Sequence, residues 1–249
     1  MYSEESIIDL VRNGTVISIS GSNKIVRISD ELVVKFGRTV HKAEAESMRL
    51  IRQKTFVKVP EVISVFESSG RTYITMKYIK GNTLDKIWNN ISIIKKMDIL
   101  HQLKRYLFQI RRIKSNIPND QCIGPWFPQE GINHFENMED IVEWLNQMIF
   151  ACKSWNVWNM GNSKFEVGTT LVFTHQDIHM KNLLVDENSK LWILDWEFSG
   201  YYPHYFEYSS TRFNKSESFI WNTLAPLTSG YYPKEFKMLE NIRKLVMHT

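Results

Sequence analysis

Two scarcities limit the class of protein. The chain of 249 residues holds only two cysteines, Cys122 and Cys152, and their separation suits neither a zinc ribbon nor a disulfide framework. It also lacks any apolar run of about 18 residues and a basic start followed by an apolar stretch. We therefore expect a protein of the reducing cytoplasm, with no membrane span.

The remaining composition is that of an ordinary globular protein, with 43% hydrophobic and 23% charged residues. The net charge of +4 is unevenly distributed. Residues 1–114 carry 21 basic and 11 acidic side chains, whereas residues 115–170 carry 2 basic and 7 acidic ones. The second of these segments also contains half of the eight tryptophans. The basic residues accompany no nucleic-acid recognition motif, so we expect no nucleic-acid partner.

Alternating and β-branched residues dominate the first third of the chain, with a helical period between two groups of strands. A helix at 3–12 would open the chain. The predicted β-β-β-α-β-β order then comprises strands at 15–20, 24–29 and 32–36, a helix within 40–53 and two strands within 61–79. Gly81 is expected to interrupt this pattern.

The period changes after Thr83, where apolar residues from Ile93 to Ile110 are spaced by three or four positions. This spacing predicts a long amphipathic helix. Further elements are expected as helices within 136–153, at 215–224 and at 233–246, and as strands at 183–186 and 191–195. The fold class is thus α+β, with a β-rich lobe at 1–78 before an α-rich lobe at 79–249.

Candidate chemistry concentrates in the segment from His175 to Asp195. Asp177 and Asn182 stand in the order H-x-D-x4-N, and Asp195 ends an apolar run thirteen residues later. Phosphoryl transfer needs a carboxylate to orient a hydroxyl and oxygen ligands for magnesium. Kinase catalytic loops have this spacing. The competing interpretation is a set of turn and capping residues.

A second candidate is Lys35, at the end of an apolar strand and before a helix that contains Glu44 and Glu46. A buried ammonium needs a carboxylate partner. The two glutamates lie about 200° apart on a helix, so only one can face the strand. We favour Glu44, and the alternative to the whole pairing is a solvated lysine.

The segment from Met76 to Tyr78 lies where the two lobes should join. A purine needs apolar surfaces and one or two backbone hydrogen bonds from an extended segment. Met76 and Tyr78 are therefore predicted to line the nucleotide site, on the basis of their position alone.

Together these segments resemble the aminoglycoside phosphotransferase family of kinase-like enzymes, in particular its fungal-type members, over about residues 14–240. The resemblance is carried by THQDIHMKNLLVD, by LDWEFSGYYPHYFEY, by KFG with the following Glu44-Ala45, and by VKVPEV and MKYIKGNTL. It implies a bilobal kinase-like fold, ATP with Mg²⁺, and transfer of the γ-phosphate to a hydroxyl of a small molecule. Asp177 would be the catalytic base, Asn182 and Asp195 the metal ligands, and Lys35 with Glu44 the phosphate clamp.

The chain departs from kinase patterns at three places. It has no G-x-G-x-x-G loop, so backbone N–H groups of a shorter turn at Gly21 and Ser22 would cover the phosphates. Gln176 replaces the arginine of protein-kinase catalytic loops, and no A-P-E segment follows Asp195. Protein substrates are therefore not expected, although a protein kinase remains a weaker alternative.

Several alternatives stay open at this point. A nucleotide-binding pseudokinase or scaffold would keep the fold without the reaction. Glu197 could reach a second magnesium, line the acceptor site or be structural. The acidic, aromatic segment 115–170 suggests a cationic acceptor, aminoglycoside-like or choline-like, but Glu139, Asp140 and Glu143 would equally suit a solvated helix face. The sequence specifies neither the acceptor nor an oligomeric state.

Overall fold

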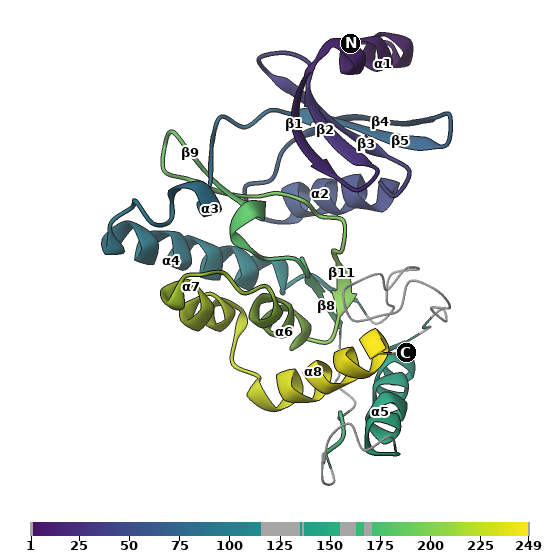
Figure 1. The fold of residues 1–249 in the computed structure, drawn as a ribbon, viewed down its shortest axis with the longest axis vertical. Coiled ribbons are helices and arrows are strands. Elements are labelled where there is room, and N and C mark those ends of the chain that lie inside the picture. The colour runs from purple at the N-terminus through teal and green to yellow at the C-terminus, as the bar shows by residue number, and fades with distance from the viewer. Residues whose placement is uncertain (1, 116–134, 136, 155–162, 167–170, 249) are drawn as a thin grey trace. The chain divides into compact units, whose positions relative to one another are not determined.

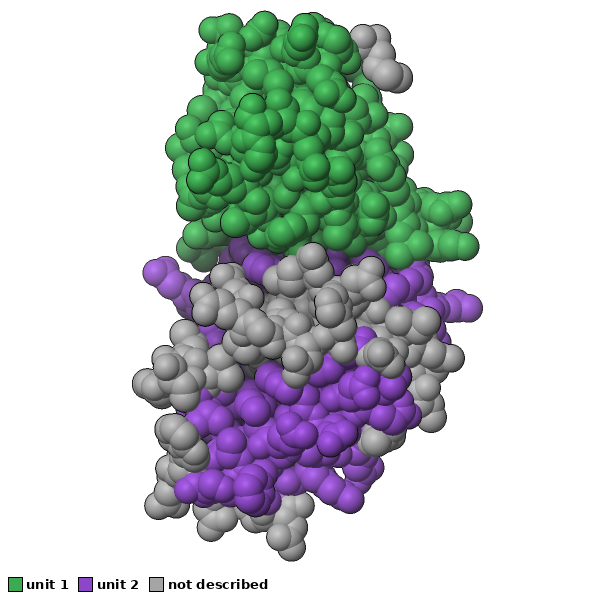
Figure 2. Space-filling view, turned by 90° about the vertical axis from the view of Figure 1, so that its right-hand side faces the viewer, with its two compact units in different colours: residues 1–90, 181–197 green, residues 91–180, 198–249 purple. Residues whose placement is uncertain are grey.

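The computed structural model describes residues 2–115, 135, 137–154, 163–166 and 171–248 (Figure 1). By internal contacts the chain divides into two compact units, residues 1–90 with 181–197 and residues 91–180 with 198–249 (Figure 2). The lobes at 1–78 and 79–249 were expected from the change between strand and helix patterns along the chain, and they remain a prediction.

The first unit contains a five-stranded antiparallel sheet in the order β1-β2-β3-β5-β4. The expected sequence of strands and helices is confirmed, with ends shifted by one or two residues. The elements are α1 (Glu4–Asn13), β1 (Thr15–Ser20), β2 (Asn23–Arg27), β3 (Leu32–Gly37), α2 (Lys42–Lys54), β4 (Val62–Ser68) and β5 (Arg71–Lys77).

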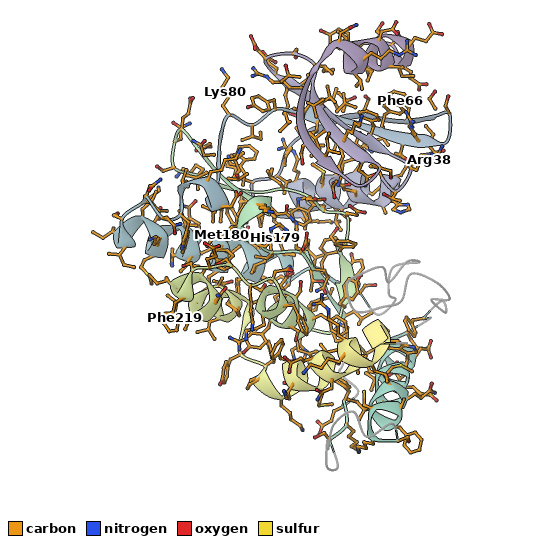
Figure 3. The ribbon with its side chains drawn as sticks, in the orientation of Figure 1. Arg38, Phe66, Lys80, His179, Met180 and Phe219 are labelled. Atoms are coloured by element: carbon orange, nitrogen blue, oxygen red, sulfur yellow. The ribbon has the colours of Figure 1, made fainter. Side chains whose placement is uncertain are left out.

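The two helices cover opposite faces of this sheet (Figure 1). Ile7 of α1 packs into a cluster with Val34, Phe36, Phe66 and Tyr73, and Phe66, labelled in Figure 3, stacks on Tyr73 with ring centroids 4.8 Å apart. Side chains alternate along a strand. Because Val34 and Phe36 face α1, Lys35 between them faces α2.

A smaller sheet of the first unit joins distant parts of the chain. It has the order β10-β9-β6, from β6 (Gly81–Thr83), β9 (Leu183–Asp186) and β10 (Leu191–Ile193), and α3 (Leu84–Ile87) follows β6. Gly81 does not interrupt the structure as expected but begins β6, opposite Asp186. A Cβ at Gly81 would lie 2.4 Å from the Val185 carbonyl oxygen, so this close pairing requires glycine.

The second unit is mainly helical, with a small sheet in the order β11-β8-β7. Its elements are α4 (Ile93–Ile110), β7 (Lys114–Ser115), α5 (Met138–Ser154), β8 (Leu171–Thr174), β11 (Gly200–Tyr202), α6 (Phe206–Phe213), α7 (Phe219–Leu224) and α8 (Pro233–His248). Apolar residues of α5, α6 and α8 share one core, including Leu145, Phe206 and Leu239. In the part of the chain that the structure describes, no helix has the length and apolarity needed to cross a membrane.

One expected helix differs from the structure. The sequence pattern predicts a helix at 215–224, whereas α7 begins at Phe219 because Ser218 caps it, accepting a hydrogen bond from the Trp221 N–H at 3.2 Å. Helix α6 before it was not predicted. Its polar side chains Glu207 and Ser210 are buried, so the helix has no polar face of the kind that periodicity detects.

The acidic, aromatic segment is only partly described. Trp126, Phe127, Trp155 and Trp158 lie outside the described residues. On α5, Glu139 and Glu143 are exposed, whereas Trp144 packs against the core of the second unit. These two carboxylates therefore occupy a solvated helix face.

Candidate active site

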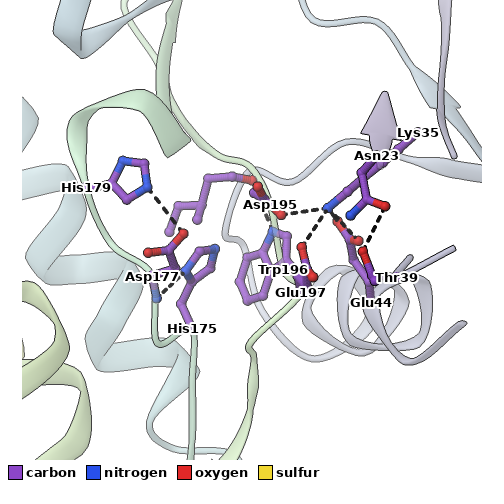
Figure 4. A network of polar contacts seen from close by, with 11 residues as sticks. Asn23, Lys35, Thr39, Glu44, His175, Asp177, His179, Asp195, Trp196 and Glu197 are labelled. Atoms are coloured by element: carbon purple, nitrogen blue, oxygen red, sulfur yellow. Dashed lines mark hydrogen bonds and ion pairs between the residues drawn. The ribbon is translucent and has the colours of Figure 1, made fainter. Parts of the chain in front are cut away.

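Lys35 of the first unit lies at the centre of three carboxylates (Figure 4). Its side chain is 5% exposed. Its Nζ donates to Glu44 Oε1 at 2.9 Å and to Asp195 Oδ1 at 2.7 Å, and Glu197 Oε2 lies 3.7 Å away. Glu46 is exposed on the other side of α2. The structure thus brings Lys35 together with Glu44, and the alternative of a solvated lysine is wrong.

The charges of this cluster do not balance. Burial opposes the charge of Lys35, but the carboxylates of Glu44 and Asp195 outweigh it and raise the pKa of the ammonium above its usual value. Burial also raises the pKa of Glu44 and of Glu197, and the charge of Asp195 adds to both shifts. One ammonium therefore faces an excess of negative charge, which a further cation would relieve.

Asn182 and Asp195 are neighbours because of the β9–β10 hairpin. Leu183 pairs with Ile193, and the Leu194 N–H donates to the Asn182 carbonyl oxygen at 2.8 Å. Asp195 then turns out of the hairpin with a φ of 60°, a conformation that is uncommon for a residue other than glycine. Its side chain is 38% exposed, so it contacts Lys35 while remaining open to a ligand.

These residues fit a magnesium ion rather than a metal that needs a full protein cage. Within the described ranges, no group of three or more histidines, cysteines, aspartates or glutamates could hold a metal by itself. Magnesium commonly binds through one or two carboxylates, with waters and phosphates completing its octahedron. Asp195 and Asn182 would provide protein oxygens, and the excess of negative charge around Lys35 fits a divalent cation.

The turn at Gly21 and Ser22 is a two-residue connection between β1 and β2, since Ser20 pairs with Asn23. Gly21 has a φ of 54°, which glycine adopts without strain. Asn23 anchors the turn, because its Oδ1 accepts from Thr39 Oγ1 at 2.9 Å. A Cβ at Gly37 would meet that same oxygen at 2.0 Å, so glycine is required there too.

Met76 lies near the end of β5, and Tyr78 directly follows this strand. Met76 is buried opposite Val33. The Tyr78 N–H donates to the Glu31 carbonyl oxygen at 2.7 Å, and the Arg27 guanidinium lies 4.4 Å from the centre of its ring. The Tyr78 N–H is therefore already hydrogen-bonded to Glu31, and a contact of Tyr78 with a nucleotide would have to use other atoms.

Asp177 belongs to the second unit and lies in the loop after β8 (Figure 4). Its Oδ1 accepts from Asn214 Nδ2 at 3.0 Å, and its Oδ2 lies 3.2 Å from His179 Nε2. Burial opposes the charge of this carboxyl, but His179, His175 and the Asn214 hydrogen bond outweigh burial and lower the pKa of Asp177. Asp177 is thus an oriented carboxylate at neutral pH.

Helix α6 holds the backbone of this loop. The fully buried Glu207 accepts the N–H groups of His175 at 2.5 Å and Gln176 at 3.2 Å. The Ser210 hydroxyl donates to the Gln176 carbonyl oxygen. Gln176 itself has a φ of 67°, and such strained backbone persists where surrounding contacts impose it. Burial raises the pKa of Glu207 to about 7.

Sequence reasoning missed Glu207, Asn214 and Asn23. Glu207 stands within the PHYFEY stretch, which resembles the corresponding stretch of the aminoglycoside phosphotransferase family. No spacing between Glu207 and another reactive residue indicated a role for it. Asn214 follows α6, and nothing in its neighbourhood along the chain links it to Asp177. His179 stands two residues after Asp177 in the sequence, and the structure pairs the two side chains.

Comparisons with known proteins identify the fold of the chain. The chain is similar in fold to aminoglycoside phosphotransferase APH(4)-Ia (TM-score 0.62, 13% identity, 97% of this chain and 88% of that one). It is also similar to ADP-bound aminoglycoside phosphotransferase APH(2'')-Ib, with a TM-score of 0.62 and 14% identity over 98% of this chain and 90% of that one. A third similar structure is choline kinase LicA from Streptococcus pneumoniae, with a TM-score of 0.54 and 12% identity over 98% of this chain and 89% of that one. These likenesses show the kinase-like α+β fold that was predicted. No curated protein matches by sequence.

A family model provides the assignment that fold similarity alone does not. The model of the phosphotransferase enzyme family matches residues 14–221, which include Lys35, Asp177 and Asp195. The match covers more than half of the chain and confirms the predicted class of enzyme. This chain belongs to the phosphotransferase enzyme family.

Proposed function

We propose that this protein transfers the γ-phosphate of ATP to a hydroxyl group of a small molecule, with Mg²⁺ as the metal. The observation that carries the proposal is the Asp177 carboxylate, which is oriented by Asn214 and His179 and ionised at neutral pH. A base for an alcohol needs these two properties, because it must accept a hydrogen bond from the attacking hydroxyl.

The nucleotide would be held by the first unit. Lys35, positioned by Glu44, is the proposed partner of the α- and β-phosphates, and the exposed turn at Gly21 and Ser22 offers backbone N–H groups to them. Met76 would line the purine site. Asn182 and Asp195 would hold the magnesium, which when bound neutralises charge on the phosphates.

Asp177 and Asn182 are five residues apart in the chain, although they belong to different compact units. We propose that these two groups act on one ATP molecule. Asp177 would orient the acceptor hydroxyl and accept its proton, while Lys35 would stabilise charge on the phosphates. The reaction would need no covalent intermediate, since positioning and charge stabilisation supply most of the acceleration in phosphoryl transfer.

The proposed acceptor is a cationic or polar alcohol. Two observations favour this class: the acidic, tryptophan-rich composition of residues 115–170, and fold similarity to enzymes named for aminoglycosides and choline. Carboxylates and aromatic rings bind amines and quaternary ammonium groups. Screening with ATP decides this point, because phosphorylation of neutral or anionic alcohols alone would contradict a cationic acceptor.

A catalytically silent nucleotide-binding protein is the second candidate. It would bind Mg-ATP, but it would neither hydrolyse ATP nor phosphorylate any acceptor.

We place the enzyme in the cytoplasm, where ATP is available.

The proposal is tested by Asp177→Asn. The amide keeps the shape of the side chain but cannot accept the proton, so turnover should fall by about 10²-fold or more while ATP binding is unchanged. Asp98→Asn, at an exposed position of α4, is the matched control and should keep full activity. Undiminished turnover of Asp177→Asn would overturn the assignment of the base.

A further inference from the structure

A cavity of about 490 Å³ lies at one end of the large sheet of the first unit. It is formed by the turn between β4 and β5 and by the segment that connects β3 to α2. Its lining includes Arg38, His41, Glu67, Arg71 and Thr72, and Figure 3 marks Arg38 beyond the end of β3. None of the lining residues is among those that we assign to ATP or magnesium.

Two arginines belong to the lining of this cavity. Gly37, the last residue of β3, pairs with Thr72 of β5, and Arg38 and Arg71 each stand one residue beyond that pair. Both side chains are exposed at the same cavity. Like charges close together repel, and an anion bound between the two guanidinium groups would relieve that repulsion.

Among the described residues, no acidic side chain forms an ion pair with either arginine, whereas the charge of His41 interacts with Glu197 and opposes the rise of the pKa of that carboxyl. Neither Arg38, Arg71 nor His41 forms an ion pair or side-chain hydrogen bond with another described residue. The one acidic residue in the lining, Glu67, has its Oε1 3.3 Å from Lys42 Nζ. The cavity thus presents two uncompensated guanidinium groups and an imidazole.

We propose that this cavity binds the phosphate group of a small ligand. A guanidinium donates two parallel hydrogen bonds to phosphate oxygens, and two such groups match the double charge of a phosphate. Thr72 and the serines of the β4–β5 turn add neutral hydroxyl groups to the wall. The volume lies within the range of small-molecule sites, so it has room for a phosphomonoester as well as a free phosphate ion.

The test is thermal unfolding of the whole chain in increasing inorganic phosphate, with chloride replacing it at equal ionic strength. At ten times the dissociation constant, phosphate should raise the Tm by about 3–6 °C, and the shift should saturate. Arg38→Gln and Arg71→Gln should each lose this shift. Arg49→Gln, which removes an exposed arginine of α2 outside the cavity, should keep it.

Two further measurements separate a lost site from a lost fold. Without phosphate, Arg71→Gln should melt at or slightly above the wild-type Tm, because the variant relieves repulsion between like charges. Arg38→Lys keeps the charge but not the planar fork, and should retain only part of the shift. Glycerol phosphate, titrated in parallel, distinguishes the two sources: saturation at lower concentration than inorganic phosphate indicates a phosphomonoester, and the reverse indicates free phosphate.

The proposal is overturned if the wild-type protein shows no saturable shift with either compound. It is equally overturned if the double variant Arg38→Gln and Arg71→Gln keeps the full shift, since phosphate would then be binding elsewhere, for example near Lys35.

Discussion

At the scale of single residues, the two proposed reactive groups obtain their charge in opposite ways. Lys35 stays charged although it is buried, because Glu44 and Asp195 surround it. Asp177 stays charged because His179 and Asn214 outweigh its desolvation. In both cases a neighbouring side chain determines the protonation state, so removing that neighbour should change function without touching the reactive group.

Glu44→Gln should lower the free energy of unfolding by about 2 kcal/mol. This is less than the 3–5 kcal/mol typical of a broken buried pair, because Asp195 still contacts the ammonium. ATP affinity should fall with it, since Lys35 loses its orientation. Urea unfolding and nucleotide titration measure both effects. Glu46→Gln, on the exposed side of the same helix, should change stability by less than about 0.5 kcal/mol.

His179→Gln should raise the pKa of Asp177, because it removes the hydrogen bond and charge that lower it. The carboxyl must be ionised to accept a proton, so activity is lost as the pH falls through its pKa. The acidic limb of the pH–rate profile should therefore move to higher pH in this variant. An unmoved limb would remove His179 from this role, and His101→Gln, at an exposed position of α4, is the control.

At the scale of elements, helix α6 holds the conformation of the proposed catalytic loop after β8. The Glu207 carboxylate accepts hydrogen bonds from the backbone N–H groups of His175 and Gln176. The Ser210 hydroxyl donates to the carbonyl oxygen of Gln176, directly before Asp177. A loop with a residue at φ 67° has no periodic hydrogen bonds of its own to define it. The helix therefore supplies partners that the loop cannot supply for itself.

The raised pKa of Glu207 predicts the direction in which the stability of the protein changes with pH. Its pKa is about 7 in the folded protein against 4.5 ordinarily, so the folded state binds more protons between these values and stability decreases as the pH rises through this window. The difference corresponds to about 3 kcal/mol. In the wild type, the free energy of unfolding should therefore decrease between pH 5 and pH 8. In Glu207→Gln this decrease, measured by urea unfolding, should be smaller by about 3 kcal/mol.

Glu217→Gln, an exposed substitution beyond the end of α6, should follow the wild-type dependence on pH. If Glu207→Gln also follows it, Glu207 is ionised throughout this range and its raised pKa is refuted.

At the scale of the whole molecule, the proposed machinery is divided between two compact units. Lys35, Asn182 and Asp195 belong to the first, and Asp177 belongs to the second. Nucleotide binding and proton acceptance should therefore be separable by mutation.

Asp195→Ala should abolish magnesium-dependent stabilisation by ADP. At 100 times the dissociation constant, Mg-ADP should raise the Tm of the wild type by about 5–10 °C, and a chelator should remove most of this rise. Asp177→Asn should keep the shift and Asp195→Ala should lose it. Asp85→Ala, at an exposed position of α3 in the same unit, is the control. Retention of the full shift in Asp195→Ala would exclude Asp195 as the metal ligand.

The sequence alone determined the order of strands and helices from α1 to β5, because periodicity within one segment needs no partner. It also determined that Asp177, Asn182 and Asp195 stand in kinase-like spacing. The tertiary structure decided which glutamate faces Lys35, and it brought Glu207 and Asn214 to the proposed catalytic loop. These contacts join residues 9 to 37 positions apart, and such pairs are selected by packing and desolvation in three dimensions rather than by local spacing.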